Sequence, residues 1–253
     1  MIEKKEKFNK TYKIVKALES GLYQKYLDGD LVLQDIANEY GVTIQHIASI
    51  IKENNIGNPN KEKKLHRDEE RKLIKRDIEN GLPVDYFKPN YKIFENVSSP
   101  INAFNTISRW VKKDEFHTDI PYITLSRLNK IILSVNIRKY VESNNHLPKS
   151  KKESIREIAE RFNVIYTKVG NIASHIKKDT NKLLPQKDDE LARIVLRNLN
   201  IVEEVNYSKS SHEKAIAKAA KKFNVDKDII VSILSCEAYA KGANLEEYIE
   251  SRK

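Results

Sequence analysis

The sequence predicts an all-α fold made of four tandem three-helix units of about 61 residues each. Apolar residues recur at helical spacing along most of the chain. The 253 residues include only 7 glycines and 7 prolines, which suits helices joined by short turns. A pattern of helix, turn and helix also returns at related intervals. One alternative stays open, because residues 122–135 could form a strand on propensity alone.

The repeated pattern is well developed in residues 153–178, ESIREIAERFNVIYTKVGNIASHIKK. Ile155 and Phe162 fall on one face of a predicted first helix. Asn163 follows, and asparagine tolerates the left-handed conformation that a sharp helix end requires. Helical spacing of apolar residues resumes through Val169 and Ile172. This order predicts a helix-turn-helix, whose second helix can enter a DNA major groove.

Two further copies of the pattern lie in residues 33–52 and 215–234. The alanines at the predicted helix crossings are residues 37, 159 and 220, so their separations are 122 and 61 residues. A fourth copy is therefore expected near residue 98. Pro100 departs from the pattern there, because proline removes a donor from a helix interior. A short motif, LESG, IENG, VESN and VEEV, recurs at intervals of 60, 63 and 61 residues and supports the same period.

These intervals divide the chain into residues 1–60, 61–121, 122–185 and 186–253, which we number repeat 1 to repeat 4. Each repeat is expected to begin with a leading helix, and Pro59 lies in the first linker. Ser99 and Pro100 are expected to begin a helix that runs through Trp110. The expected helices cover residues 8–20, 33–40 and 43–55; 61–80 and 99–113; 124–141, 155–162 and 166–178; and 188–204, 212–223, 226–239 and 244–251.

Positive charge is concentrated in repeat 3. The whole chain carries a net charge of +10, and residues 122–185 alone hold 13 basic and 5 acidic residues. Repeats 1 and 4 are neutral overall. Basic residues gathered on one helix-turn-helix predict contacts with phosphate, to which the free amides at the start of the second helix could contribute. The alternative is a basic surface that serves only solubility.

Residues 33–52, LQDIANEYGVTIQHIASIIK, resemble the helix-turn-helix of bacterial and phage transcription regulators. Ala37 stands where the helices would cross, Gly41 lies in the turn, and Thr43 is a natural N-cap. The resemblance implies DNA binding and names no particular family. The residues expected to contact DNA are Thr43, Gln45, His46, Ser49 and Lys52 in repeat 1, and Lys149, Lys151, Lys152, Tyr166, Thr167, Lys168, Asn171, Ser174, Lys177 and Lys178 in repeat 3.

Several classes of function find no support in the sequence. The single cysteine, Cys236, cannot form a disulfide or a thiolate zinc site within one chain, which fits a reducing cytoplasm. No apolar run is long enough to span a membrane. None of the six histidines belongs to a His-Glu-x-x-His motif, and no glycine-rich phosphate loop occurs. We therefore expect no catalysis, metal or small-molecule cofactor.

The function predicted from the sequence is sequence-specific binding of double-stranded DNA, as a transcriptional regulator. Repeats 1 and 3 would contact bases. Repeat 4 is expected to pack or to dimerise, because Asp228 and Val231 occupy the outward face of its third helix. The alternative is an interaction protein whose helical repeats hold a protein partner, such as a component of the transcription machinery.

Overall fold

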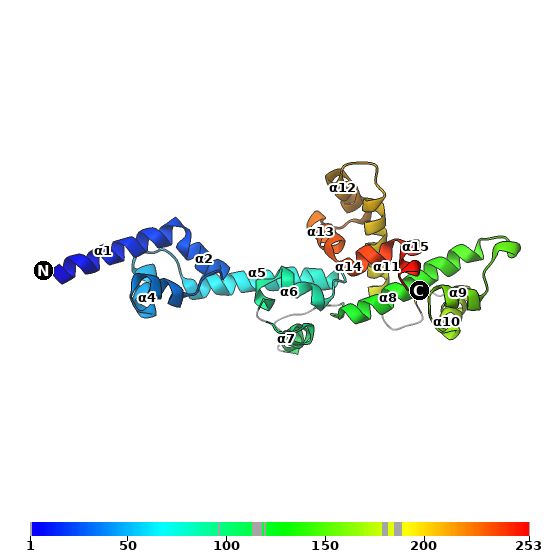
Figure 1. Ribbon diagram of the computed structural model, residues 1–253, viewed down its shortest axis with the longest axis horizontal. Helices are drawn as coiled ribbons and strands as arrows, with labels where there is room; N and C mark the ends of the chain where they lie inside the picture. The colour runs from blue at the N-terminus through cyan, green and yellow to red at the C-terminus, as the bar shows by residue number, and fades with distance from the viewer. Residues whose placement is uncertain are drawn as a thin grey trace. The chain divides into compact units, whose positions relative to one another are not determined.

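The computed structural model describes residues 2–95, 97–112, 118, 120–178, 182–184 and 189–252. Within these residues the regular structure is entirely helical and no strand occurs, which confirms the all-α prediction (Figure 1). Residues 122–135, where a strand was the alternative, contribute to helix α8, Leu125–Asn145. The chain divides into two compact units, Met1–Leu73 and Ile74–Lys253. We call them the N-terminal unit and the C-terminal unit.

The three helices expected for repeat 1 contribute side chains to the core of the N-terminal unit. Its core includes Ile14 and Leu18 before the turn region and Ile36, Ile47 and Ile50 after it, each at most 1% exposed. Helix α5 begins in this unit and ends in the next. The helices are α1 (Ile2–Ala17), a π-helical turn (Leu18–Leu22), α2 (Tyr23–Asp28), α3 (Leu33–Tyr40), α4 (Ile44–Glu53) and α5 (Pro59–Glu79).

The C-terminal unit has α8 at its centre. Side chains on every side of α8 are buried, and α10, α11 and α14 all pack against it. Before α8 the chain forms a 3₁₀ turn at Val84–Tyr86, the short helix α6 (Phe87–Asn90), a second 3₁₀ turn at Lys92–Phe94, and α7 (Pro100–Lys112). After α8 come a 3₁₀ turn at Lys149–Lys151, α9 (Ile155–Arg161), α10 (Tyr166–Lys177), α11 (Asp189–Asn206), α12 (His212–Phe223), α13 (Lys227–Ser235), α14 (Glu237–Ala243) and α15 (Leu245–Glu250).

The same tight turn joins α3 to α4, α9 to α10, and α12 to α13. Gly41, Asn163 and Asn224 take left-handed conformations there, with φ of 58°, 51° and 51°. The sequence had assigned these residues to turns because Gly and Asn reach that conformation at low cost. In each turn a valine N–H donates to the carbonyl of an alanine five residues earlier. The bonds are Val42 to Ala37 at 2.9 Å, Val164 to Ala159 at 2.9 Å and Val225 to Ala220 at 3.1 Å.

Repeat 2 departs from this arrangement. Residues 97–99 are not helical, and α7 begins at Pro100, so the segment aligned with the second helix of the other copies is not a helix. At the first helical position the missing N–H of proline has no consequence. An aromatic cluster supports α7 instead: Trp110 lies 5.7 Å from Phe94, and Phe94 stacks on Phe87 at 6.0 Å.

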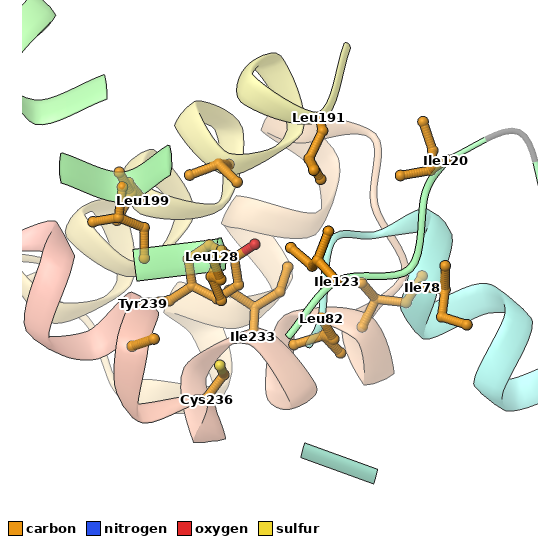
Figure 2. Packing of buried hydrophobic residues seen from close by; sticks show 14 of the residues in the cluster. Ile78, Leu82, Ile120, Ile123, Leu128, Leu191, Leu199, Ile233, Cys236 and Tyr239 are labelled. Atoms are coloured by element: carbon orange, nitrogen blue, oxygen red, sulfur yellow. The ribbon is translucent and has the colours of Figure 1, made fainter. Parts of the chain in front are cut away.

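One large core joins the sequence regions of repeats 2, 3 and 4. In Figure 2, Leu82 and Ile123 lie beside Ile233 and Tyr239. The Tyr239 ring is fully buried, and its hydroxyl donates to the carbonyl of Gly81 at 2.7 Å. Burying that hydroxyl without a partner would be costly, so this bond helps to fix the end of α5 against α14.

The helix expected over residues 226–239 is interrupted. Helix α13 ends at Ser235, Cys236 takes φ −81° and ψ 105°, and α14 begins at Glu237. The buried Cys236 carbonyl accepts from the N–H of Tyr239 at 3.0 Å, which starts the new helix. The interruption turns the chain so that Tyr239 points into the large core.

A smaller core holds the helix-turn-helix of repeat 3. The C-terminal half of α8 contributes Val141, α9 contributes Ile158, and α10 contributes Val169 and Ile172. Phe162 at the end of α9 is completely buried. Ile155, expected on the same inward face, is 39% exposed, so that part of the prediction was wrong.

Candidate nucleic-acid interface

The exposed face of α10 is polar and carries no negative charge. No acidic residue occurs anywhere in Tyr166–Lys177. Val169, Ile172 and Ala173 hold the opposite face against α8 and α9. This packing leaves the predicted contact residues outward. Those that are exposed are Tyr166, Thr167, Asn171, Ser174, Lys177 and Lys178.

Gly170 lies in the middle of this face. Glycine is unfavourable in a helix interior by roughly 1 kcal/mol relative to alanine. A methyl group at Gly170 would meet only the Cγ2 of Ile155, at 4.0 Å, so close packing within the described residues does not require glycine there. In α4 the equivalent residue is Ala48, which is exposed, whereas Gly170 is half-buried. Both helices therefore have a small residue beside their outward face, where the backbone of a binding partner could come close.

Three lysines precede α9 on an exposed segment that is held at its end. Lys149, Lys151 and Lys152 are all exposed. The side chain of Asn144, buried near the end of α8, binds both backbone groups of Glu153: its amide donates to the carbonyl at 2.9 Å, and its oxygen accepts from the N–H at 2.9 Å. This pair of bonds fixes the point at which the lysine segment joins α9.

The carboxylate of Glu153 joins α8 to the end of α9. It accepts from the guanidinium of Arg161, with one N–H···O distance of 3.1 Å, and from the hydroxyl of Tyr140 at 2.9 Å. The hydrogen bonds from Arg161, followed by that from Tyr140, lower the pKa of Glu153 below its ordinary 4.5. Burial raises the pKa of the Tyr140 phenol.

The low pKa of Glu153 gives a pH-dependent contribution to stability. Because the folded-state pKa is depressed, the contribution is complete above the ordinary pKa and is lost as pH falls through the lower folded value. We expect Glu153→Gln to reduce the free energy of unfolding at about pH 7, and the difference from the wild type to shrink toward zero on acidification. Urea unfolding at a series of pH values measures this. A difference that stays constant between about pH 7 and pH 2 would contradict it.

A capping box occupies part of the N-terminus of α9, where free amides were expected from the sequence. The hydroxyl of Ser154 accepts from the N–H of Glu157 at 3.3 Å, and the carboxylate of Glu157 accepts from the N–H of Ser154 at 2.6 Å. These bonds form a capping box and lower the pKa of Glu157. The helix terminus is thus occupied by its own carboxylate, and the lysines remain as the groups that could bind phosphate.

Lys168 differs from the other predicted contact residues because it is half-buried. With Ser134, Asn171 and His175 it lines a cavity of about 410 Å³. His175 closes one side, with its Nε2 3.1 Å from the carbonyl of Lys182. Burial, and then the nearby positive charges of Arg252 and Lys130, lower the pKa of Lys168. An anion placed there would favour the charged form of this amine.

Helix α4 presents a similar face in repeat 1. Thr43 caps the helix as predicted, since its hydroxyl oxygen accepts from the N–H of His46 at 3.2 Å. The hydroxyl proton is still available to a phosphate oxygen. Gln45, Ser49 and Lys52 are exposed along the face, and His46 is half-buried. Predicted contact residues in repeat 1 therefore lie on one side of one helix.

Helix α13 of repeat 4 has a different outward face. Asp228 is exposed in its first turn, and Val231 is 52% exposed. Two lysines of α12 are also engaged: Lys218 binds the carboxylate of Glu204 at 2.8 Å, and Lys222 binds its other oxygen. These two bonds lower the pKa of Glu204 to about 2. These two lysines therefore bind a carboxylate of the same copy rather than adding to an open basic surface.

Two features of the interface were missed from the sequence. Ile165 lies directly before α10 and is 73% exposed. The spacing of apolar residues assigned it neither to the core nor to the contact face. The signal was available, because Ile165 aligns with Thr43 and Asp226, both preferred N-cap types. Arg252 was also missed: its Nε donates to the carbonyl of Phe162 at 2.9 Å, which brings a cation to the turn. No local pattern links residues 90 positions apart.

The described residues contain no helix that is long and apolar enough to cross a membrane. Within the same residues, no group of three or more His, Cys, Asp or Glu side chains is arranged to hold a metal ion. Comparison with known proteins gives no relative: no protein-family model matches the sequence, and no curated protein or solved structure matches it.

Proposed function

We propose that this chain binds double-stranded DNA at specific sequences and acts as a transcriptional regulator. Helices α4 and α10 would each lie in a major groove. The observation that carries the proposal is the outward face of α10, which has polar side chains, no acidic residue and exposed lysines at its end and before α9. Such a face offers hydrogen bonds to base edges and positive charge to phosphates.

The residues divide into two roles under this proposal. Gln45 in α4 and Asn171 in α10 carry amide groups that can pair with the N6 and N7 edge of adenine. Lys52, Lys177 and Lys178 lie at or after the ends of these helices, where backbone phosphates pass. Lysine contacts with phosphate fix position and contribute affinity, whereas the amides select sequence.

The four-unit organisation belongs to the same proposal. The shared turn in α3–α4, α9–α10 and α12–α13 supports three related helix-turn-helix copies, and repeat 2 would be a copy that lost its second helix. Repeats 1 and 3 would contact DNA. Repeat 4, with Asp228 and Val231 outward, would pack or dimerise.

Selection of bound duplexes from a random library, followed by binding at several salt concentrations, tests the proposed function. We expect an enriched sequence and an affinity that falls steeply with salt. Failure to bind any duplex at low salt would reject DNA binding. Capture of a protein partner with an affinity insensitive to salt would then favour the interaction-protein alternative.

Replacing Gln45 by alanine is expected to weaken binding to the selected duplex by about 1–3 kcal/mol, because a bidentate contact with a base is lost. Binding to random duplexes should change little. Fluorescence anisotropy on both duplexes measures the difference. The matched control is Gln34→Ala, which removes an exposed glutamine from α3 and should leave both affinities unchanged. An equal loss on both duplexes would show that Gln45 does not contact bases.

A further inference from the structure

Ile165 occupies a position where the other two copies carry N-capping residue types. It lies six residues after Ala159, as Thr43 lies after Ala37. Thr43 caps α4 through its hydroxyl, whereas Ile165 provides no side-chain hydrogen bond at the start of α10. Aliphatic residues are among the least favourable at an N-cap. The first turn of α10 is therefore less stable than the same backbone would be with threonine.

The side chain of Ile165 also gains nothing from burial. It is 73% exposed, the highest value of any large apolar residue in the described part of the chain. Tyr166 follows it and is 60% exposed. A residue that weakens its helix and remains in water contradicts the local rules that the rest of this helix-turn-helix obeys. Such exceptions are expected where a binding partner determines the residue.

The surroundings of Ile165 fit nucleic acid better than a second protein. The apolar patch consists of Ile165 and the ring of Tyr166, and Thr167 and Asn171 next to it are polar and exposed. A stable protein interface buries about 800 Å² on each partner, far more than two side chains offer. The basic charge of residues 122–185 favours a polyanion. In the major groove of DNA, the methyl group of thymine is the apolar group exposed on a base edge.

We propose that Ile165 is a specificity-determining residue that contacts the 5-methyl group of thymine in the DNA bound by α10. The inference rests on the proposed function and deepens it by naming a base. Repeat 1 shows a related feature, since Ile44, the first residue of α4, is 37% exposed at the position equivalent to Tyr166. Both proposed recognition helices thus begin with exposed apolar surface.

The test replaces each thymine of the selected duplex, one at a time, by deoxyuridine, which removes only the methyl group. For the wild-type protein we expect at least one position where binding weakens about fourfold, the effect of one lost methyl contact. In Ile165→Ser this discrimination should disappear at that position, because serine has no methyl group to contact thymine. The same variant should raise the Tm of the full chain by about 2–4 °C, because serine restores the N-cap.

The control is Val231→Ser on α13, which changes an exposed apolar residue of repeat 4 and should keep the thymine preference. Equal binding of the thymine and deoxyuridine duplexes by the wild type, or an unchanged preference in Ile165→Ser, would overturn the inference while DNA binding itself stands. Loss of a dimer in Ile165→Ser by sedimentation, without any change in thymine preference, would assign the patch to a second copy. Failure to bind any duplex would instead reject the proposed function.

Discussion

Replacing Lys149, Lys151 and Lys152 together by alanine is expected to flatten the slope of log affinity against log salt by about 3 units. Each lysine that neutralises a phosphate releases close to one counterion. Near physiological salt the same change should weaken binding roughly 100-fold. The three side chains are exposed, and the Asn144–Glu153 bonds hold the end of their segment, so the contacts are lost without disturbing a core.

The matched control replaces Lys209, Lys214 and Lys221 of repeat 4, which are equally exposed. Lys218 and Lys222 are unsuitable, because both bind Glu204 and their removal would also break those bonds. Any loss of charge weakens long-range attraction, but only direct contacts change the number of counterions released. The salt slopes of both triple variants are measured on one duplex. Equal flattening by both would mean that phosphate contacts are spread over the C-terminal unit rather than concentrated in repeat 3.

Replacing Phe162 by alanine is expected to reduce the free energy of unfolding by about 3–5 kcal/mol. The ring is completely buried between α8, α9 and α10, where it meets the ring of Tyr140 edge-on at 5.6 Å. Its removal leaves a cavity under the helix-turn-helix of repeat 3. Chemical denaturation followed by circular dichroism measures the loss. The slope of log affinity against log salt should also become flatter, because the loosened turn no longer holds the lysines in place.

Ile155→Ala is the control for this prediction. Apolar spacing placed Ile155 on the same inward face as Phe162, but the side chain is 39% exposed. Partial exposure should limit the loss to about 1 kcal/mol. Equal losses for the two variants would mean that Ile155 contributes as much packing as Phe162, and would contradict the prediction.

The turns were predictable from the sequence for a local physical reason. Only Gly and Asn adopt the left-handed conformation readily, so Gly41, Asn163 and Asn224 after an apolar helix face marked each turn. Thr43 was predictable as an N-cap for a similar reason, because its hydroxyl replaces a missing backbone partner. Both depend on residues within a few positions of each other.

Features that depend on distant residues were not predictable. Periodicity gives the face of a helix but not the extent to which a neighbour covers it, which is why Ile155 and Lys168 differ from their expected exposure. The interruption at Cys236 follows from burying Tyr239 against Gly81, a residue 158 positions away. The segment at Pro100 fits the 61-residue period in sequence but does not form the helix-turn-helix seen in the other copies. Helix α7 begins at Pro100 and packs instead on an aromatic cluster around Phe94.

The attachment of the last residues to the turn of repeat 3 has a consequence for folding during synthesis. The carbonyl of Arg252 accepts from the side-chain amide of Asn163 at 3.0 Å, and Ile249 lies in the core beneath that turn. Some 89 residues separate Asn163 from Arg252. At about 5–20 residues per second, a ribosome adds Arg252 roughly 5–20 s after it adds Asn163. Until residues 249–252 are made, the nascent helix-turn-helix lacks part of its core, and apolar side chains of that core are accessible to chaperones.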